Sequence, residues 1–232
     1  MYRVEDKFVC TDGELLCLDL KLKTVLKTDS HQTNPNGYTI TSVYFDDISD
    51  SHLTDTREGN RFREKYRIRI YNNSYETINL EVKIKRDNRV FKKSKRITVE
   101  QMKAFMQGKY VEDNDVSLDN AITLFNIAIA ERKLAPVIVV EYERKAYIYE
   151  TGNVRITIDR NLRYSDDIVG FMNQKAYRRY LVGEPNSVLE VKYDEFLPDF
   201  IAGLLENGNM RQSSYSKYQI CREEVERCLQ KI

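Results

Sequence analysis

Residue types that mark several common functional sites are scarce in this sequence. The 232 residues include no tryptophan, two histidines and four cysteines, and no Cys-x-x-Cys pair occurs. This scarcity argues against a structural zinc site, which needs four closely spaced Cys or His ligands. The cysteines form two pairs seven residues apart, Cys10 with Cys17 and Cys221 with Cys228. We expect them to be reduced and to pack as small apolar residues on helices.

Long apolar runs and nucleotide-binding loops are missing too. No stretch has transmembrane length and none resembles a signal peptide, so we expect a soluble, cytoplasmic protein. The absence of a Walker loop, or of any other glycine-rich nucleotide signature, implies that a bound nucleotide would be recognised through its phosphates. Packing accounts for the 16 tyrosines better than stacking on nucleobases does.

Charge is balanced overall but concentrated locally. Lys plus Arg number 37 and Asp plus Glu number 36, which argues against a nucleic-acid partner, since nucleic-acid-binding domains are usually strongly basic. From Arg57 to Arg96, however, 14 basic residues stand against 5 acidic ones. A basic region within a neutral protein indicates a localised site for an anion.

Hydrophobic periodicity predicts one α+β domain, residues 1–232, with about eight mostly antiparallel strands. We expect strands at 2–10, 40–47, 63–71, 78–85, 90–98, 137–150, 154–159 and 187–194. Helices are expected at 14–26, 100–107, 118–133, 198–206 and 216–229. Thr11 is the expected N-cap of the first helix.

The strand 63–71, REKYRIRIY, carries four cations on one face and apolar residues on the other. Strands near 3–8, 80–85, 154–159 and 189–194 repeat this pattern, and their polar faces mix Lys or Arg with an occasional carboxylate. For a single strand, a solvated basic face would be the simpler interpretation. Repetition over five strands favours a sheet whose charged faces serve a common purpose.

Closure of such a sheet into a barrel, with apolar faces outward against helices, would line an interior with cations. Burying so many cations is prohibitive without counter-charge. A polyanion would supply it, because phosphate oxygens accept bidentate hydrogen bonds from arginine. The carboxylates among the cations could hold a divalent metal that bridges the phosphates.

The chain resembles the catalytic domain of the vacuolar transporter chaperone (VTC) complex, a polyphosphate polymerase among the triphosphate tunnel metalloenzymes. The resemblance runs from Tyr2 to about Arg222 and rests on SVYFD, YRIRIY, LEVKIK, YERKAY, VRITID, VLEVK and SYSKY, in this order. It implies an antiparallel eight-stranded β-barrel that encloses a basic tunnel, with flanking helices and a C-terminal helix that caps one mouth.

The resemblance also implies which residues act. The implied catalytic cations are Lys7, Arg67, Arg69, Lys83, Arg144, Arg155 and Lys217. The implied substrate-binding residues are Lys92, Tyr142, Lys192 and Ser216, and Glu190 is the implied ligand of Mn²⁺ or Mg²⁺. In FKKSK the pattern does not decide whether Lys92 or Lys93 points inward. Strict alternation also places Arg144 on the face of Val140 and Tyr142, opposite Glu141 and Glu143, so we expect a bulge or a strand end there.

Three functions agree with these features. The leading hypothesis is a metal-dependent polymerase that transfers the γ-phosphoryl group of ATP to a growing polyphosphate chain and releases ADP. A triphosphatase or polyphosphatase of the same fold is the second, although Arg3 stands where those enzymes place a first carboxylate. The third is a non-catalytic module that binds polyphosphate or inositol polyphosphates. Because no segment spans a membrane, export of the polymer would need a separate membrane partner.

Overall fold

A computed structural model describes residues 3–29, 32, 34–87, 89–181, 187–206 and 210–230. The chain divides into two compact units whose segments alternate along the sequence. Unit 1 comprises Met1–Thr39, Tyr142–Leu162 and Tyr180–Tyr215, and unit 2 comprises Ile40–Glu141, Arg163–Arg179 and Ser216–Ile232. Organisation as one domain stays a prediction.

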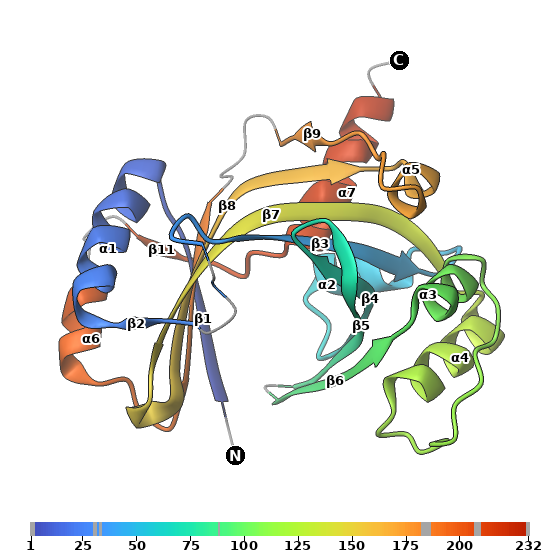
Figure 1. Ribbon diagram of the computed structural model, residues 1–232, viewed down its shortest axis with the longest axis horizontal. Coiled ribbons are helices and arrows are strands. Elements are labelled where there is room, and N and C mark those ends of the chain that lie inside the picture. Colours follow the sequence, from blue (N-terminus) through green and yellow to red (C-terminus); the bar gives the residue numbers. More distant parts are fainter. Residues whose placement is uncertain are drawn as a thin grey trace. The chain divides into compact units, whose positions relative to one another are not determined.

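Seven α-helices and eleven strands are formed by the described residues (Figure 1). The helices are α1 (Asp12–Val25), α2 (Ser51–Glu58), α3 (Val99–Met106), α4 (Ala121–Arg132), α5 (Ile168–Met172), α6 (Asp199–Leu205) and α7 (Lys217–Leu229). The longer strands are β1 (Arg3–Val9), β3 (Tyr38–Asp46), β4 (Phe62–Tyr71), β5 (Ser74–Arg86), β6 (Arg89–Ile97), β7 (Ala135–Tyr149), β8 (Val154–Ser165) and β10 (Val188–Asp194). Three strands have two residues each, β2 (Lys27–Thr28), β9 (Arg179–Tyr180) and β11 (Arg211–Gln212).

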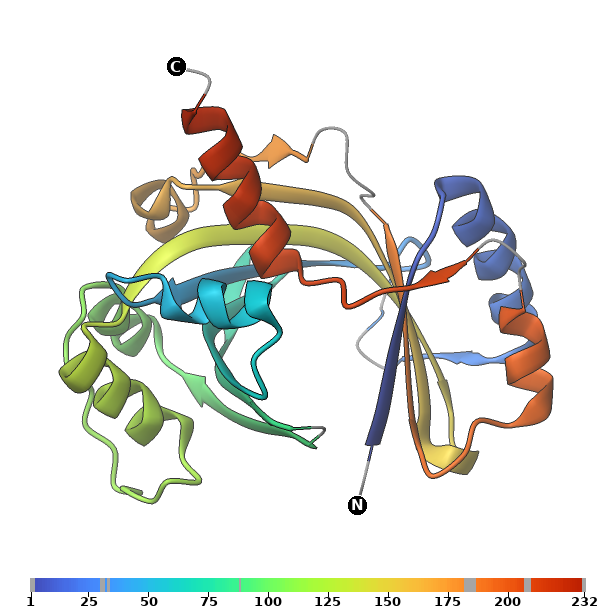
Figure 2. The same cartoon turned by 180° about the vertical axis from the view of Figure 1, so that it is seen from behind.

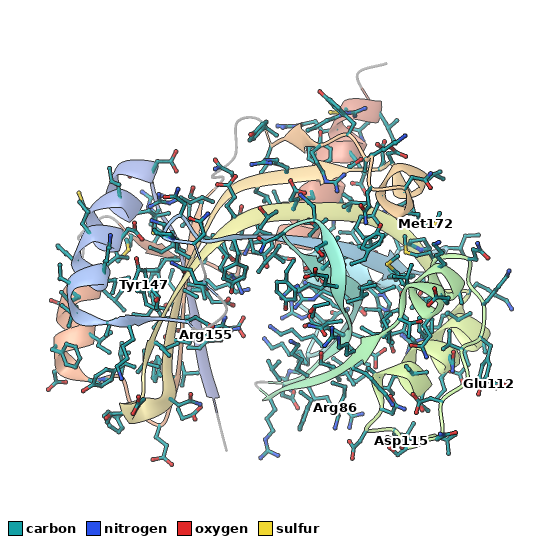
Figure 3. The ribbon with its side chains drawn as sticks, viewed as in Figure 1. Arg86, Glu112, Asp115, Tyr147, Arg155 and Met172 are labelled. Atoms are coloured by element: carbon teal, nitrogen blue, oxygen red, sulfur yellow. The ribbon has the colours of Figure 1, made fainter. Side chains whose placement is uncertain are left out.

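In unit 1 the strand order is β11-β1-β10-β8, and every pairing among these strands is antiparallel. One face of this sheet is apolar and packs against α1 and α6, which lie side by side (Figure 1). Thr11 caps α1 as predicted: its side chain accepts a hydrogen bond from the Glu14 N–H, and Glu14 accepts one from the Thr11 N–H at 2.7 Å. Tyr147, labelled in Figure 3, is buried here and donates to Asp19 of α1 at 2.8 Å.

In unit 2 the order is β7-β3-β4-β5-β6. Ile68 and Leu80 on its apolar face are fully buried beneath α3 and α4. Phe125 of α4 lies at the centre of this core, with its ring centroid 5.1 Å from that of Tyr66 and 5.3 Å from that of Phe45. Both contacts are edge-on, the geometry that aromatic quadrupoles favour. Because side chains alternate between the two faces of a strand, burial of the apolar face places the charged residues of β3, β4 and β5 on the opposite face.

Helix α5 was not predicted from the sequence, and neither was α2. The buried side chains of α2 are His52, Leu53 and Thr56, so only one large apolar residue marks its inner face. It packs against α7 (Figure 2), and Tyr218 of α7 donates a hydrogen bond of 2.5 Å to the buried carboxylate of Asp46 on β3. Because Leu53 is the one large apolar residue on the buried face of α2, the apolar periodicity that reveals an amphipathic helix is weak in this segment.

The antiparallel sheet and its flanking helices are as predicted, and the eight longer strands correspond to the eight expected ones. Within the described residues the sheet is open, with β11 and β6 at its two edges and no pairing between them. The predicted closed barrel of eight strands is therefore corrected to an open sheet of eleven strands in the described residues, and a capping role for α7 stays a prediction. None of the described helices is both long enough and apolar enough to cross a membrane.

Candidate functional site

Four charged side chains alternate in sign on the polar face of unit 1. Lys7 of β1 stands opposite Glu190 of β10, and Glu5 stands opposite Lys192. The Lys7 ammonium is 3.4 Å from Glu5 and 3.9 Å from Glu190. The Lys192 ammonium is 3.6 Å from Glu5 and 3.4 Å from Glu190. Each lysine therefore contacts both carboxylates, and we call these four residues the Glu190 cluster.

Glu190 is the buried member of this cluster, with 7% of its surface exposed. Burial opposes its ionisation, but Lys192, Lys7 and Arg144 outweigh that effect and hold the pKa of Glu190 well below its usual range. Lys7 also donates to the backbone carbonyl of Tyr215 at 3.1 Å. Glu190 is therefore a permanent anion at neutral pH.

Arg144 of β7 is held by a carboxylate. Its Nε and Nη2 donate to the two oxygens of Asp159 on β8 at 2.6 and 2.7 Å, and its Nη2 lies 3.8 Å from Glu190. Its guanidinium also lies 5.3 Å from the centre of the Tyr142 ring, within cation–π range. Burial opposes the charge, but Asp159 outweighs it and raises the pKa of Arg144. Two guanidinium nitrogens of Arg144 are therefore already hydrogen-bonded to Asp159.

The contacts of Arg144 also settle which face it shares. Arg144 and Tyr142 lie on the same face of β7, and the contact with Asp159 identifies that face as the charged one. Glu141 instead accepts hydrogen bonds from Arg163 and Arg178, at 3.1 and 3.2 Å. The expected bulge at Arg144 rested on taking Tyr142 as a marker of the apolar face, and that assumption was wrong.

Arg155 of β8, labelled in Figure 3, points a second guanidinium into the polar face of unit 1. Its Nη2 lies 2.7 Å from Asp29 and 3.4 Å from the hydroxyl of Tyr38. Among the described residues, five side-chain atoms of β8 are buried without a hydrogen-bond partner, and two of them, Arg155 Nε and Thr157 Oγ1, lie on this face. Thr157 is directly opposite Glu190 on β10.

In unit 2, a buried glutamate gathers the cations of the polar face. Arg67 Nε and Nη2 each lie 2.6 Å from Glu81 Oε2, Lys92 Nζ lies 2.6 Å from Oε1, and Arg69 Nη1 lies 3.9 Å away. Arg67 also donates to the hydroxyl of Tyr44 at 3.0 Å. Burial opposes ionisation of Glu81, but these three cations outweigh it and lower its pKa far below the usual range. We call these residues the Glu81 cluster.

Three lysines form a row across neighbouring strands of unit 2. Lys65 pairs with Lys83 across β4 and β5, and Lys83 pairs with Lys92 across β5 and β6. Like charges directly opposite one another destabilise a sheet, so this row favours a bound anion. Lys65 donates to Ser216 at 2.9 Å, and Ser216 is the N-cap of α7, whose first residue is Lys217.

The structure decides between the two candidate lysines of β6. Lys92 contacts Glu81 on the charged face. Lys93 forms an ion pair with Asp119, at the start of the segment that leads into α4. Lys92 therefore shares a face with the other predicted cations.

The predicted site residues fall into two groups, each assembled within one unit. Unit 1 holds Lys7, Tyr142, Arg144, Arg155, Glu190 and Lys192, and unit 2 holds Arg67, Arg69, Lys83, Lys92, Ser216 and Lys217. Sequence reasoning left four residues out of the predicted site: Glu5, Lys65, Glu81 and Asp159. Each lies at an alternating position within a charged strand pattern, and that pattern was the available signal.

The Glu190 cluster fits a divalent ion only in part. Glu5 and Glu190 are carboxylates on neighbouring strands, and their lysine contacts of 3.4 Å or more are longer than close ion pairs. Nowhere in the described parts of the chain do three or more His, Cys, Asp or Glu side chains gather to hold a metal. Two carboxylates suit Mg²⁺ or Mn²⁺, which take further ligands from water and substrate phosphates.

The model of the VTC domain family matches residues 2–225 of this chain. No curated protein matches it. An adenylate cyclase candidate from Vibrio parahaemolyticus has a similar structure, with a TM-score of 0.51 and 11% identity over 95% of this chain and 97% of that one. An adenylate cyclase candidate from Bacillus halodurans has a TM-score of 0.49 and 12% sequence identity, over 99% of this chain and 92% of that one. A Mimivirus capping enzyme triphosphatase has a TM-score of 0.38 and 9% sequence identity, over 88% of this chain and 87% of that one. The family match covers nearly the whole sequence, and this chain therefore belongs to the VTC domain family.

Proposed function

We propose that this protein is a metal-dependent polyphosphate polymerase, which transfers the γ-phosphoryl group of ATP to a growing polyphosphate chain and releases ADP. The observation that carries the proposal is the row of Lys65, Lys83 and Lys92 beside the Glu81 cluster. Aligned cations on one face of a sheet, whose other face is a packed core, call for a polyanion as counter-charge. Membership of the VTC domain family supports the same conclusion.

The charged side chains of each unit are suited to phosphoryl transfer. That reaction needs little covalent chemistry from protein and depends on in-line positioning and neutralisation of phosphate charge. Arg67 and Arg144 are fixed by carboxylates, so they offer charge at defined positions. Lys83, Lys92 and Lys192 are flexible point charges that can follow a moving polymer.

In this proposal Glu190 and Glu5 hold the divalent ion, Mn²⁺ or Mg²⁺. The bound ion supplies additional positive charge against the transferring phosphates. Lys7 and Lys192 each contact both carboxylates, so they hold the pair in position before the substrate arrives. The carboxylates and the ammonium groups then share the neutralisation of the substrate.

The decisive experiment is incubation of the purified protein with ATP and Mn²⁺. A polymerase produces ADP together with acid-labile polymer, in matching amounts. Orthophosphate without polymer would instead indicate a hydrolase, and pyrophosphate release would indicate a cyclase, the activity in the name of the similar Vibrio structure. Tight binding of ATP or triphosphate without any product would leave only a binding module.

Hydrolysis of triphosphate or polyphosphate is the second candidate. The observation in its favour is that Glu5 and Glu190 both contact Lys192, because two neighbouring carboxylates can hold a divalent ion beside an attacked phosphate. Glu5 lies between two lysines, which lowers the negative charge available for a second ion. The polymerase is therefore favoured. A separate membrane partner for export and a cytoplasmic location remain parts of the proposal.

A further inference from the structure

The hydroxyl of Thr157 has no hydrogen-bond partner although it is buried. Thr157 lies in the middle of β8 with 2% of its surface exposed, and its Oγ1 contacts neither protein donor nor acceptor. Leaving a buried hydroxyl unpaired costs free energy, and native proteins satisfy nearly all such groups. Thr157 Oγ1 is one of five such side-chain atoms in the described residues, all of them on β8, and an unpaired buried hydroxyl of this kind calls for a partner from outside the chain.

Charged side chains flank Thr157 on its face of the strand. Arg155 and Asp159 are two residues away on either side and so share its face of β8. Across the ladder, Thr157 stands opposite Glu190, and Arg155 stands opposite Lys192. The hydroxyl therefore lies inside the polar face that contains the Glu190 cluster.

A second unsatisfied atom lies on the same strand face. The Nε of Arg155 is also buried without a partner, while its Nη2 is engaged by Asp29. The guanidinium nitrogen can only donate, and a threonine hydroxyl can donate as well as accept. A group that satisfies both must present acceptor oxygens, and it must suit the neighbouring cations Arg155 and Lys192. Phosphate oxygens meet both requirements.

We propose that Thr157 donates a hydrogen bond to a phosphate oxygen of bound triphosphate or polyphosphate, beside the phosphate bound by Arg155. This inference rests on the proposed function and adds a substrate-binding residue to it. The hydroxyl is unsatisfied in the free protein and satisfied in the complex. The unpaired hydroxyl makes the free protein less stable than an apolar residue would. Because ligand binding satisfies the hydroxyl, Thr157 makes the free energy of binding more favourable.

The inference makes opposite predictions for stability and for binding. Thr157→Val keeps the shape of the side chain and removes the hydroxyl. In the free protein we expect the Tm to stay equal to the parent's or to rise by about 2–4 °C, because an unpaired polar group is replaced by an apolar one. Affinity for inorganic triphosphate, measured by calorimetry without divalent metal, should fall by about tenfold or more. Thr157→Ser should bind like the parent.

Thr41 provides a matched control. It is a fully buried threonine on β3, but its hydroxyl is paired, at 3.1 Å from Glu141 and 2.9 Å from Asn73. Thr41→Val should therefore lower the Tm of the free protein by a few degrees and leave triphosphate affinity within about twofold of the parent's.

Two results would overturn the inference. A Tm of Thr157→Val well below the parent's would show that the hydroxyl has a partner in the free protein, such as a buried water. Unchanged triphosphate affinity in that variant would show that the hydroxyl does not contact the ligand. If the parent itself binds no triphosphate, the proposed function fails and this inference falls with it. The parent's binding curve thus tests the function, and the ratio of variant to parent tests Thr157.

Discussion

Arg67 and Glu81 occupy directly opposed positions on β4 and β5, and the guanidinium grips one carboxylate oxygen through two nitrogens at 2.6 Å each. Glu81 is 2% exposed, and Lys92 approaches its other oxygen. A buried carboxylate is thus the internal counter-charge of a cluster that carries more positive than negative charge. A phosphate chain entering this face would compete with Glu81 for the same cations.

Glu81→Gln should destabilise the free protein by about 3 kcal/mol, because the buried Arg69 and the half-buried Arg67 lose the negative charge of their shared carboxylate. Triphosphate should then raise the Tm of the variant more than that of the parent, since phosphate replaces the lost charge and meets no competitor. Urea unfolding and thermal melts with and without triphosphate measure both effects. Equal stability of variant and parent would contradict the counter-charge role.

The pH dependence of stability follows from the lowered pKa of Glu81. As pH falls below the ordinary carboxyl value of 4.5, the unfolded chain takes up a proton that the folded protein does not. The contribution of Glu81 is therefore fully present at neutral pH and is lost as pH falls toward the folded pKa. The difference in unfolding free energy between the parent and Glu81→Gln should shrink on acidification below pH 4.5. A difference that stays constant from pH 7 down to the acid limit of folding would argue against this linkage.

Glu190→Gln separates an enzyme from a binding module. If Glu190 holds the metal, turnover of ATP should fall by orders of magnitude, while triphosphate still binds to the lysines and arginines. An ion pair with Lys192 alone, which the 3.4 Å contact also allows, would leave activity almost intact. ADP release and polymer yield are measured beside calorimetric affinity. Glu143→Gln is the control, because Glu143 accepts a hydrogen bond from Asn161 outside the cluster.

Lys92→Ala and Lys93→Ala form a matched pair of neighbouring charge deletions. Lys92 belongs to the lysine row, so its loss should weaken triphosphate binding about tenfold or more. Lys93 pairs with Asp119, so its loss should change affinity only about twofold. Titration calorimetry compares the two variants. Similar losses in both would mean that net charge, and not the charged face, determines binding.

Tyr218→Phe tests the attachment of α7. The hydroxyl of Tyr218 donates to the buried Asp46, whose carboxylate also accepts from the N–H groups of His52 and Leu53. Removing the hydroxyl should cost about 1–3 kcal/mol of unfolding free energy, because a buried carboxylate loses one donor. Tyr110→Phe, on a side chain that is 67% exposed, should change little in the same urea titration. A stability equal to the parent's would show that this bond does not anchor the helix.

Local pattern predicted much of this protein. Alternation placed the eight longer strands and their charged faces, and the capping box at Thr11 and Glu14 marked the start of α1, because each signal lies within a few neighbouring residues. Local pattern did not predict helix α2, because Leu53 is its only buried large apolar side chain. The two-residue strands were not predicted either, because a segment of two residues is too short to show an alternating pattern.

The sequence by itself determined that cations concentrate on one face of several strands, since side-chain alternation is a property of the extended backbone. Only the tertiary structure decided how these cations are compensated. Register between distant strands brings Glu5 and Glu190 to the same two lysines, joins Arg144 to Asp159 and sets Glu81 among Arg67, Arg69 and Lys92. Register is fixed by burial of the opposite, apolar face, which involves residues far apart in the chain. No local pattern contains that information, so the identity of each counter-charge, and the unpaired hydroxyl of Thr157, emerge only from the fold.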